Sequence, residues 1–242
     1  MDLKNKISLV TGASSGIGKA IALGLAREGA TVIFTYNSNE KGAEDTLNEL
    51  GENADKFKVD MRNEDQIDAL FAFITKKYGT LDVLVNNAGV NRPRDLFDQS
   101  IWKEVFQINL FSLVQCSGEA VKLMSNGGKI LNISSIYGYG QACYKGLPAY
   151  GASKAAVNHF TQTMAKNFAP KILVNAIAPG YVQTPLWGEK SEQEFEDSGK
   201  EQLIERMIQP EEVAQMAIAV IKNDAMTGEI VTIDGGISLK TI

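Results

Sequence analysis

Tyr150 and Lys154 have the residue types and the spacing that proton transfer requires. They stand four positions apart at the start of a predicted helix, Tyr150 to Phe168, so both side chains project from one face. An unperturbed tyrosine has a pKa of about 10, and lowering it by about 3 units requires roughly 4 kcal/mol of differential stabilisation. The ammonium of Lys154 would favour the phenolate, because a nearby opposite charge favours the ionised form of an acid. Tyr150 could then protonate a carbonyl oxygen during a reduction, or act as the base in the reverse direction.

A glycine-rich segment, Thr11-Gly12-Ala13-Ser14-Ser15-Gly16-Ile17-Gly18, has the composition of a dinucleotide cradle. It follows a short apolar run, Ile7 to Val10, and leads into a predicted helix. The glycines permit a tight turn, close approach by a pyrophosphate and close helix packing, while the helix N-terminus supplies free N–H groups. Glycine-rich turns also join strands to helices without a ligand, but the position after the first strand favours the cradle. Beside such a cradle, catalysis explains Tyr150 and Lys154 better than a buried tyrosine with a lysine that reaches solvent.

The end of the second predicted strand bears on the choice of nicotinamide cofactor. In dinucleotide folds an acidic residue at this place bonds the adenosine ribose of NAD. Here the stretch from Phe34 to Ser38 contains no carboxylate, and the first acid is Glu40. We therefore expect NADP(H) in preference to NAD(H), with Ser38, Asn37 or Lys41 as contacts for a 2′-phosphate, although the stretch has no arginine.

Apolar runs alternate with helical patterns along the whole chain. The predicted strands are Ile7 to Val10, Thr31 to Thr35, Phe57 to Val59, Leu81 to Val85, Lys129 to Ile133, Ile172 to Ile177 and Ile230 to Ile233. The predicted helices are Ile17 to Gly29, Lys41 to Leu50, Glu64 to Tyr78, Ser100 to Met124, Tyr150 to Phe168 and Pro210 to Ile221. Strands without polar alternation indicate a parallel sheet covered on both faces. We predict an α/β fold, a Rossmann-type doubly wound sheet of about seven parallel strands with helices on both faces.

One domain spanning residues 1–242 is expected, because neither half carries a linker. The one long irregular stretch, Ala178 to about Gly199, contains Trp187 and an acidic run from Glu189 to Asp197. A connection of that length is typical of a lid or binding loop, and we place a substrate lid at residues 185–205. A solvated insertion with one short helix is the alternative.

Composition excludes several classes of protein. Twenty-four Lys and Arg against 29 Asp and Glu give a formal charge of -5, which provides no field for attracting nucleic acid. The two cysteines, Cys116 and Cys143, lack the spacing of a zinc site or a disulfide framework, and the single histidine, His159, is expected to be a packing or surface residue, so no metal is expected. Because the N-terminus lacks a signal peptide and no apolar run is long enough to span a membrane, a cytoplasmic protein is expected.

Five motifs in order give the chain a family resemblance. They are Thr11 to Gly18, Asn86-Asn87-Ala88-Gly89, Tyr150-Gly151-Ala152-Ser153-Lys154, Pro179-Gly180 with Thr184, and Ile233-Asp234-Gly235-Gly236. Over essentially all 242 residues the chain resembles a short-chain dehydrogenase/reductase of the compact, single-domain type, and in general it is similar to 3-oxoacyl-[acyl-carrier-protein] reductases. The resemblance implies an oxidoreductase that moves a hydride between a nicotinamide and a carbonyl or secondary-alcohol carbon.

The resemblance also implies roles for single residues. The catalytic set would be Asn109, Ser135, Tyr150 and Lys154: Lys154 binds the nicotinamide ribose, Ser135 bonds the substrate oxygen, and Asn109 holds a water in the proton relay. Ser134 is the alternative to Ser135, because the interval to Tyr150 is longer than usual in the family. Asp60 would bond the adenine amino group, or else cap the next helix. The expected cofactor-binding residues are Gly12, Ser14, Ser15, Gly16, Ile17, Gly18, Tyr36, Asn37, Ser38, Asp60, Met61, Asn87, Ala88, Gly89, Tyr150, Lys154, Pro179, Gly180, Val182 and Thr184.

The substrate is less determined than the reaction. Reduction of a carrier-bound 3-oxoacyl group is one alternative, but Ser125 to Gly128 and Ala169 to Lys171 offer little positive charge for an acidic carrier, and the predicted lid is acidic. The other alternative for the substrate is a small molecule such as a ketone, sugar, polyol or other carbonyl compound. Tyr137, Tyr139, Cys143 and Tyr144 would suit an apolar or ring-shaped substrate, or would anchor their loop. A non-catalytic NAD(P)-sensing protein is a rival from another class, which the complete catalytic set disfavours.

The family commonly forms tetramers through two long helices, and we expect a homotetramer. Apolar residues on the corresponding helices are compatible with such a contact or with core packing: Val105, Ile108, Leu113, Ala155, Ala156 and Phe160.

Overall fold

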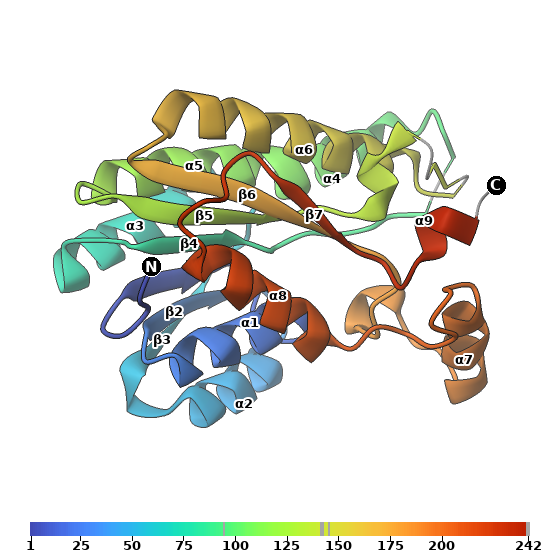
Figure 1. The fold of residues 1–242 in the computed structure, drawn as a ribbon, viewed down its shortest axis with the longest axis horizontal. Helices are drawn as coiled ribbons and strands as arrows, with labels where there is room; N and C mark the ends of the chain where they lie inside the picture. The colour runs from blue at the N-terminus through green and yellow to red at the C-terminus, as the bar shows by residue number, and fades with distance from the viewer. Residues whose placement is uncertain (94, 141–142, 145, 241–242) are drawn as a thin grey trace.

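A seven-stranded parallel sheet runs through the molecule in the order β3-β2-β1-β4-β5-β6-β7 (Figure 1). The computed structural model describes residues 1–93, 95–140, 143–144 and 146–240. The strands are β1 Ile7–Val10, β2 Thr31–Tyr36, β3 Ala54–Lys58, β4 Val83–Asn86, β5 Gly128–Ile133, β6 Ile172–Pro179 and β7 Ile230–Ile233. The predicted Rossmann-type fold is confirmed, and the strand order reverses direction between β1 and β4.

Helices cover both faces of the sheet, as Figure 1 shows. One face carries α1 Gly16–Arg27, α2 Glu40–Leu50 and α8 Pro210–Lys222, and the other carries α3 Glu64–Tyr78, α4 Gln99–Phe106, α5 Ser112–Leu123 and α6 Pro148–Phe168. In the described part of the chain, no helix is both long and apolar enough to cross a membrane.

Successive residues of the central strands feed two separate hydrophobic cores. Leu9 and Leu84 pack into the core beneath α3, α5 and α6, whereas their neighbours Val10 and Val85 pack into the core beneath α1 and α8. This follows from the strand geometry, in which successive side chains point to opposite faces. It explains why these strands are continuously apolar instead of alternating.

The prediction of one regular helix from Ser100 to Met124 is wrong. A π-helical segment, η2 Gln107–Phe111, separates α4 from α5. Within it the Asn109 side chain bonds both backbone groups of Val90. Such π turns inside helices are frequent at functional sites, and the apolar spacing of the sequence does not reveal them.

The structure decides one alternative that the sequence left open and shifts one helix boundary. Val105 and Leu113 are buried inside the chain, so neither is available for a contact with a second copy. The helix that carries Tyr150 begins two residues earlier than expected, at Pro148, because proline is well tolerated in the first turn. His159 is exposed on the same helix, as expected for a surface residue.

A buried hydrogen-bond network joins the strands that carry the site to the helices above them. The Asn86 side-chain amide donates to the Ser117 hydroxyl at 3.0 Å and to Asn132 Oδ1 at 2.9 Å, and Asn132 Nδ2 donates to Thr161 Oγ1 at 2.9 Å. These residues belong to β4, α5, β5 and α6. Because an unmade buried hydrogen bond costs about 1–3 kcal/mol, the network fixes how α6 lies over β5.

The connection between β6 and α8 contains the segment expected to be the lid. It holds a short 3-10 turn, η5 Pro185–Trp187, and one helix, α7 Glu192–Lys200, which lies at the edge of the molecule (Figure 1). A β-bridge between Val182 and Ile208 closes its base. The segment therefore has two fixed ends beside the carboxyl edge of the sheet.

Candidate active site

Two adjoining cavities open at the carboxyl edge of the sheet. The larger has a volume of about 380 Å³ and the smaller about 100 Å³, and they share Ile17, Asn87, Gly89, Thr184 and Leu186. This is the edge at which ligands bind in open α/β sheets, next to the reversal of strand order.

The structure brings nearly all of the expected site residues to these cavities. The larger is lined by Gly12, Ser14, Ser15, Gly16, Ile17, Gly18, Tyr36, Asn37, Ser38, Asp60, Met61, Asn87, Ala88, Gly89 and Thr184. The smaller is lined by Ser135, Tyr150, Lys154, Pro179, Gly180 and Val182, together with Ile17, Asn87, Gly89 and Thr184. Asn109 lines neither. The lining residues that the sequence analysis did not name as site residues are Asn39, Val90, Ile108 and Ile133, whereas Pro185 and Leu186 belong to the segment predicted to be the substrate lid. Of these, Asn39 and Val90 directly follow segments that were identified.

The glycine-rich segment is fastened to the end of β4. The Thr11 hydroxyl accepts hydrogen bonds from the backbone N–H groups of Asn87 and Ala88, each at 3.0 Å. In return, the Asn87 side-chain amide donates to the carbonyl oxygens of Thr11 at 2.9 Å and Gly12 at 2.8 Å. Four bonds therefore hold the segment in one position before any ligand binds.

Gly12 and Gly18 of this segment lie so close to neighbouring atoms that neither position has room for a side chain. A Cβ atom at Gly18 would lie 2.4 Å from Asn87 Nδ2 and 2.5 Å from the Gly12 carbonyl oxygen. Gly12 has a φ of +67°, and a Cβ there would lie 2.9 Å from the Ala88 Cα. Within the described structure, Ser15 makes no side-chain capping bond at the start of α1, so the first N–H groups of this helix are available to an anion.

The adenosine end of the larger cavity is polar. Asn37 and Ser38 line it after β2, and the next residue, Asn39, caps α2 by accepting a bond from the Gly42 N–H at 3.0 Å. Lys41 has an 87% exposed side chain that pairs with Asp45 at 2.9 Å. Lys41 is thus a surface residue beside the cavity and not part of its lining.

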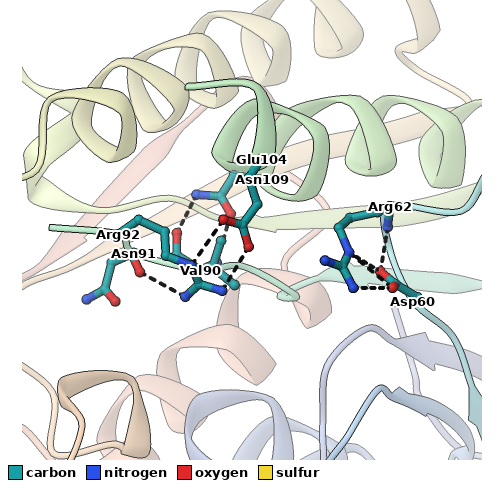
Figure 2. Close-up of polar contacts among 7 residues, drawn as sticks. All are labelled: Asp60, Arg62, Val90, Asn91, Arg92, Glu104 and Asn109. Carbon is teal, nitrogen blue, oxygen red and sulfur yellow. Dashed lines mark hydrogen bonds and ion pairs between the residues drawn. The ribbon is translucent and has the colours of Figure 1, made fainter. Parts of the chain in front are cut away.

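Asp60 is bound to Arg62 and does not cap the following helix (Figure 2). Arg62 Nη2 lies 2.6 Å from Asp60 Oδ2, and the hydrogen bond from this guanidinium lowers the pKa of the Asp60 carboxyl. Asn63 caps α3 instead, by accepting a bond from the Gln66 N–H. The capping alternative for Asp60 is therefore wrong, and its carboxylate lines the cavity in its ionised form.

Tyr150 and Lys154 both line the smaller cavity, and burial is the main cause of the pKa shifts of both side chains. Lys154 Nζ lies 5.6 Å from the Tyr150 ring centroid and donates to the Ile133 carbonyl oxygen at 2.7 Å. Burial raises the pKa of Tyr150 to about 12, with a hydrogen bond from the Ser135 hydroxyl acting in the opposite direction. Burial also lowers the pKa of Lys154 to about 8. The expectation that Lys154 lowers the pKa of this tyrosine is therefore wrong for this structure, in which Tyr150 stays protonated at neutral pH.

The two serines after β5 have different surroundings. The Ser134 hydroxyl donates to Asn158 Oδ1 at 2.5 Å, so it holds the end of β5 against α6. The Ser135 hydroxyl accepts a bond from the Tyr137 N–H at 3.2 Å and bonds to Tyr150. Ser135 is thus the serine that contacts Tyr150.

The Asn109 side chain holds the loop that follows β4 (Figure 2). Its Oδ1 accepts a bond from the Val90 N–H at 2.8 Å, and its Nδ2 donates to the Val90 carbonyl oxygen at 2.9 Å. Nδ2 also donates to the Ser153 hydroxyl at 3.2 Å. The Arg92–Glu104 ion pair, at 3.0 Å, fixes the same loop to α4. The polar atoms of Asn109 are therefore engaged, and a relay role for this residue stays a prediction.

Comparisons with known proteins agree with this arrangement. Residues 12–238 match the family model described as enoyl-(acyl carrier protein) reductase. The chain is 36% identical to the 3-oxoacyl-[acyl-carrier-protein] reductase FabG of Aquifex aeolicus, over 97% of this chain and 98% of the relative. It is 38% identical to a 3beta-hydroxysteroid dehydrogenase of Mediterraneibacter gnavus, over 96% and 94%. Its structure resembles that of a single-residue variant of the actinorhodin polyketide ketoreductase with NADPH, with a TM-score of 0.88 at 33% identity over 97% of each chain.

A Gly18→Ala substitution is expected to weaken dinucleotide binding about 10-fold or more, because the added Cβ would displace Asn87 and overpacking costs about 1–3 kcal/mol. The matched control is Gly118→Ala in α5, where an added Cβ would meet no described atom within 4 Å apart from its chain neighbours and the nearby backbone of its own helix. Titration of both variants with NADPH, followed by fluorescence, makes the comparison. Equal affinity in the two variants would contradict the proposed role of Gly18.

A Lys154→Met substitution is expected to stabilise the protein in the absence of cofactor. The pKa of Lys154 is about 8 when folded against an ordinary value of 10.5, so between these pH values the unfolded chain binds more protons and stability rises with pH. Below pH 8 the folded state carries the full cost of burying the Lys154 charge. The variant should therefore gain about 1–3 kcal/mol in the free energy of unfolding at pH 7, and this gain should disappear towards pH 10.5. Urea unfolding at several pH values measures it, with exposed Lys166→Met as the control. A loss of stability at pH 7 would contradict the account.

Proposed function

The chain belongs to the short-chain dehydrogenase/reductase family, and on that premise we propose that it transfers a hydride between a nicotinamide dinucleotide and a carbonyl or secondary-alcohol carbon. It is a dehydrogenase/reductase that acts on CH–OH groups. The observation that carries the finer proposal is the continuity of two cavities, one over the glycine-rich segment and one around Ser135, Tyr150 and Lys154.

The residues of the larger cavity fit a dinucleotide. Gly12 and Gly18 line this cavity beside the start of α1, and the uncapped N-terminus of that helix suits the charge of a pyrophosphate. The nicotinamide supplies or accepts the hydride when it is bound. Lys154 would bind its ribose hydroxyls, and Pro179, Gly180 and Thr184 would border its carboxamide.

Tyr150 is the proposed proton donor in the reductive direction. Ser135 would hold the substrate oxygen beside it by a hydrogen bond. As the hydride reaches the carbonyl carbon, the π electrons move to oxygen, and the Tyr150 hydroxyl gives that oxygen its proton. The Tyr150 hydroxyl is protonated at neutral pH, so it has a proton to give in this direction. The reverse reaction uses the same groups in the opposite order.

We propose NADP(H) as the preferred cofactor. Asn37 and Ser38 at the end of β2 provide hydrogen-bonding groups and no carboxylate that would repel a 2′-phosphate. Among the described residues that line this cavity, the one carboxylate, Asp60, is paired with Arg62. A similar structure, the polyketide ketoreductase, contains NADPH.

Reduction of a carrier-bound 3-oxoacyl group is a second candidate function. It is supported by 36% identity to a carrier-protein reductase over nearly the whole chain. The acidic run from Glu189 to Asp197 disfavours it, because an acidic carrier would approach a surface of its own charge.

A homotetramer is the proposed assembly. Phe111 and Val114 are exposed at the junction of η2 and α5, with Phe111 53% exposed, and apolar surface of this kind favours contact with another copy. Sedimentation of the wild type at micromolar concentration should give a tetramer, and Phe111→Glu should dissociate it. A wild-type monomer over that range would contradict the proposal.

Replacement of Tyr150 by Phe is expected to lower kcat by a factor of at least about 100 while cofactor affinity changes less than about twofold, because only the proton donor is removed. Steady-state rates and a separate NADPH titration check the two parts. Turnover close to the wild-type value, or a collapse of NADPH binding, would contradict the role given to Tyr150.

The dissociation constant for NADPH is expected to be at least about 10-fold below that for NADH, in line with about 1.4 kcal/mol from contacts to the 2′-phosphate. Ser38→Asp places a carboxylate where NAD-binding folds carry one, so it should reverse the preference. Tighter binding of NADH by the wild type would show that the lack of a carboxylate after β2 does not decide the choice.

A further inference from the structure

Tyr137 holds a cluster of aromatic rings beside the catalytic tyrosine. It lies in a short 3-10 turn after β5, η3 Ile136–Gly138, and its ring is edge-on to Tyr150, with 6.4 Å between centroids and 81° between planes. It stacks on Tyr144 at 5.4 Å and 30°. The Tyr137 hydroxyl donates to the Tyr181 hydroxyl at 3.0 Å, so the ring is fixed in rotation as well as in place.

Trp187 continues the cluster into the smaller cavity. Its ring lies edge-on to Tyr181 at 5.0 Å, and its indole N–H donates to the Val182 carbonyl oxygen at 2.8 Å. Trp187 lines the cavity that also contains Ser135 and Tyr150. A fixed apolar ring therefore borders the place at which the proposed function puts the substrate carbonyl.

We call Tyr137, Tyr144, Tyr181 and Trp187 the aromatic wall. Its outer member, Tyr144, is 54% exposed, and Leu186, which lines both cavities, is 44% exposed. Covering such surface is favourable by about 25 cal/mol per Å² of apolar area. Aromatic faces also favour flat or compact rings, whose whole surface can lie against them without loss of chain entropy.

The segment beside the wall is strongly acidic. Residues 189–205 contain seven carboxylates and two lysines, a formal charge of -5. Lys200 is paired with Asp197 at 2.9 Å. Lys190 lies 4.9 Å from the Trp187 ring centroid. Hydrogen bonds from Ser191 and the charge of Lys190 lower the pKa of the Glu194 carboxyl, so a carboxylate already opposes this lysine. A net charge of -5 in the segment that follows Trp187 disfavours the approach of an anionic substrate.

We propose that the natural substrate class is an uncharged ketone or secondary alcohol whose reacting carbon lies in or next to an apolar ring. The aromatic wall binds the ring, and the acidic segment at 189–205 discriminates against carboxylates and carrier-linked thioesters. This inference rests on the proposed hydride transfer and adds the identity of the molecule that receives it.

Four ketones separate shape from charge. 4-Methylcyclohexanone and 2-heptanone have the same number of carbons, and both are uncharged, but only the first is a ring. 4-Oxocyclohexanecarboxylate keeps the ring and adds a negative charge, and acetoacetyl-coenzyme A is an anionic acyclic thioester. With NADPH as reductant, kcat/KM for 4-methylcyclohexanone is expected to exceed each of the others by about 10-fold or more, a difference of about 1.4 kcal/mol.

The outcomes distinguish this inference from the function on which it rests. Faster turnover of 2-heptanone, of the carboxylate or of acetoacetyl-coenzyme A contradicts the substrate class and leaves hydride transfer intact. No turnover of any of the four, with NADPH or NADH, counts against the proposed function and overturns the inference with it.

Variants of the wall and of the acidic segment test the two parts separately. Trp187→Ala and Tyr144→Ala are expected to raise KM for 4-methylcyclohexanone by about 10-fold, Tyr144→Phe to retain the wild-type value, and all three to keep NADPH affinity.

Glu196→Gln should raise kcat/KM for the carboxylate by about twofold and leave kcat/KM for the uncharged ring unchanged. Glu52→Gln, an exposed carboxylate before β3, is the charge control. An unchanged KM in both alanine variants contradicts the role of the wall, and equal effects of the two Glu→Gln changes contradict the role of the acidic segment.

Discussion

The four hydrogen bonds between Thr11-Gly12 and Asn87-Ala88 are the interaction on which the site depends. They join the carboxyl ends of β1 and β4, the two neighbouring strands between which the order of the sheet reverses. Connections leave in opposite directions at such a point and open a crevice. Because the Asn87 amide also occupies the space that a side chain at Gly18 would need, the geometry of the cradle and the identity of that glycine are parts of one constraint.

Burial imposes a second constraint, on the proton chemistry. Lys154 is almost completely buried, and its ammonium is held by the Ile133 carbonyl oxygen and by no carboxylate among the described residues. Desolvation lowers the pKa of Lys154 and raises that of Tyr150. Lys154 therefore loses its proton more easily than an exposed lysine, and Tyr150 keeps its proton more firmly than an exposed tyrosine. The Asn86–Asn132–Thr161 network and the Ser134–Asn158 bond keep α6 in place above this costly arrangement.

The sequence was sufficient to predict that the seven described strands exist, although β3 begins at Ala54 and not at Phe57, and that the glycine-rich segment and the Tyr150–Lys154 pair line cavities at one sheet edge. These features depend on local patterns: apolar runs, glycine spacing and a four-residue helical step. The sequence failed where partners come from distant segments. The π turn at Gln107–Phe111 has the apolar spacing of an ordinary helix, and only the Val90 backbone, which Asn109 bonds, marks it out. Asp60 is a different case, because its partner Arg62 is only two residues away and the sequence alone does not show which neighbouring group Asp60 bonds. The pKa of Tyr150 could not be judged from its distance to Lys154 in sequence, because burial sets it.

Hydride transfer beside Tyr150 is the central claim, and an isotope experiment tests it most directly. NADPH that carries deuterium at C4 of the nicotinamide, in one of its two configurations, would be used to reduce a ketone, and the product alcohol would be examined by mass spectrometry and NMR. The account predicts one deuterium on the carbinol carbon, delivered from one of the two configurations only, because the dinucleotide is held in a single orientation between the glycine cradle and Tyr150. Product alcohol without deuterium from either configuration would contradict direct transfer, and with it the function proposed for this site.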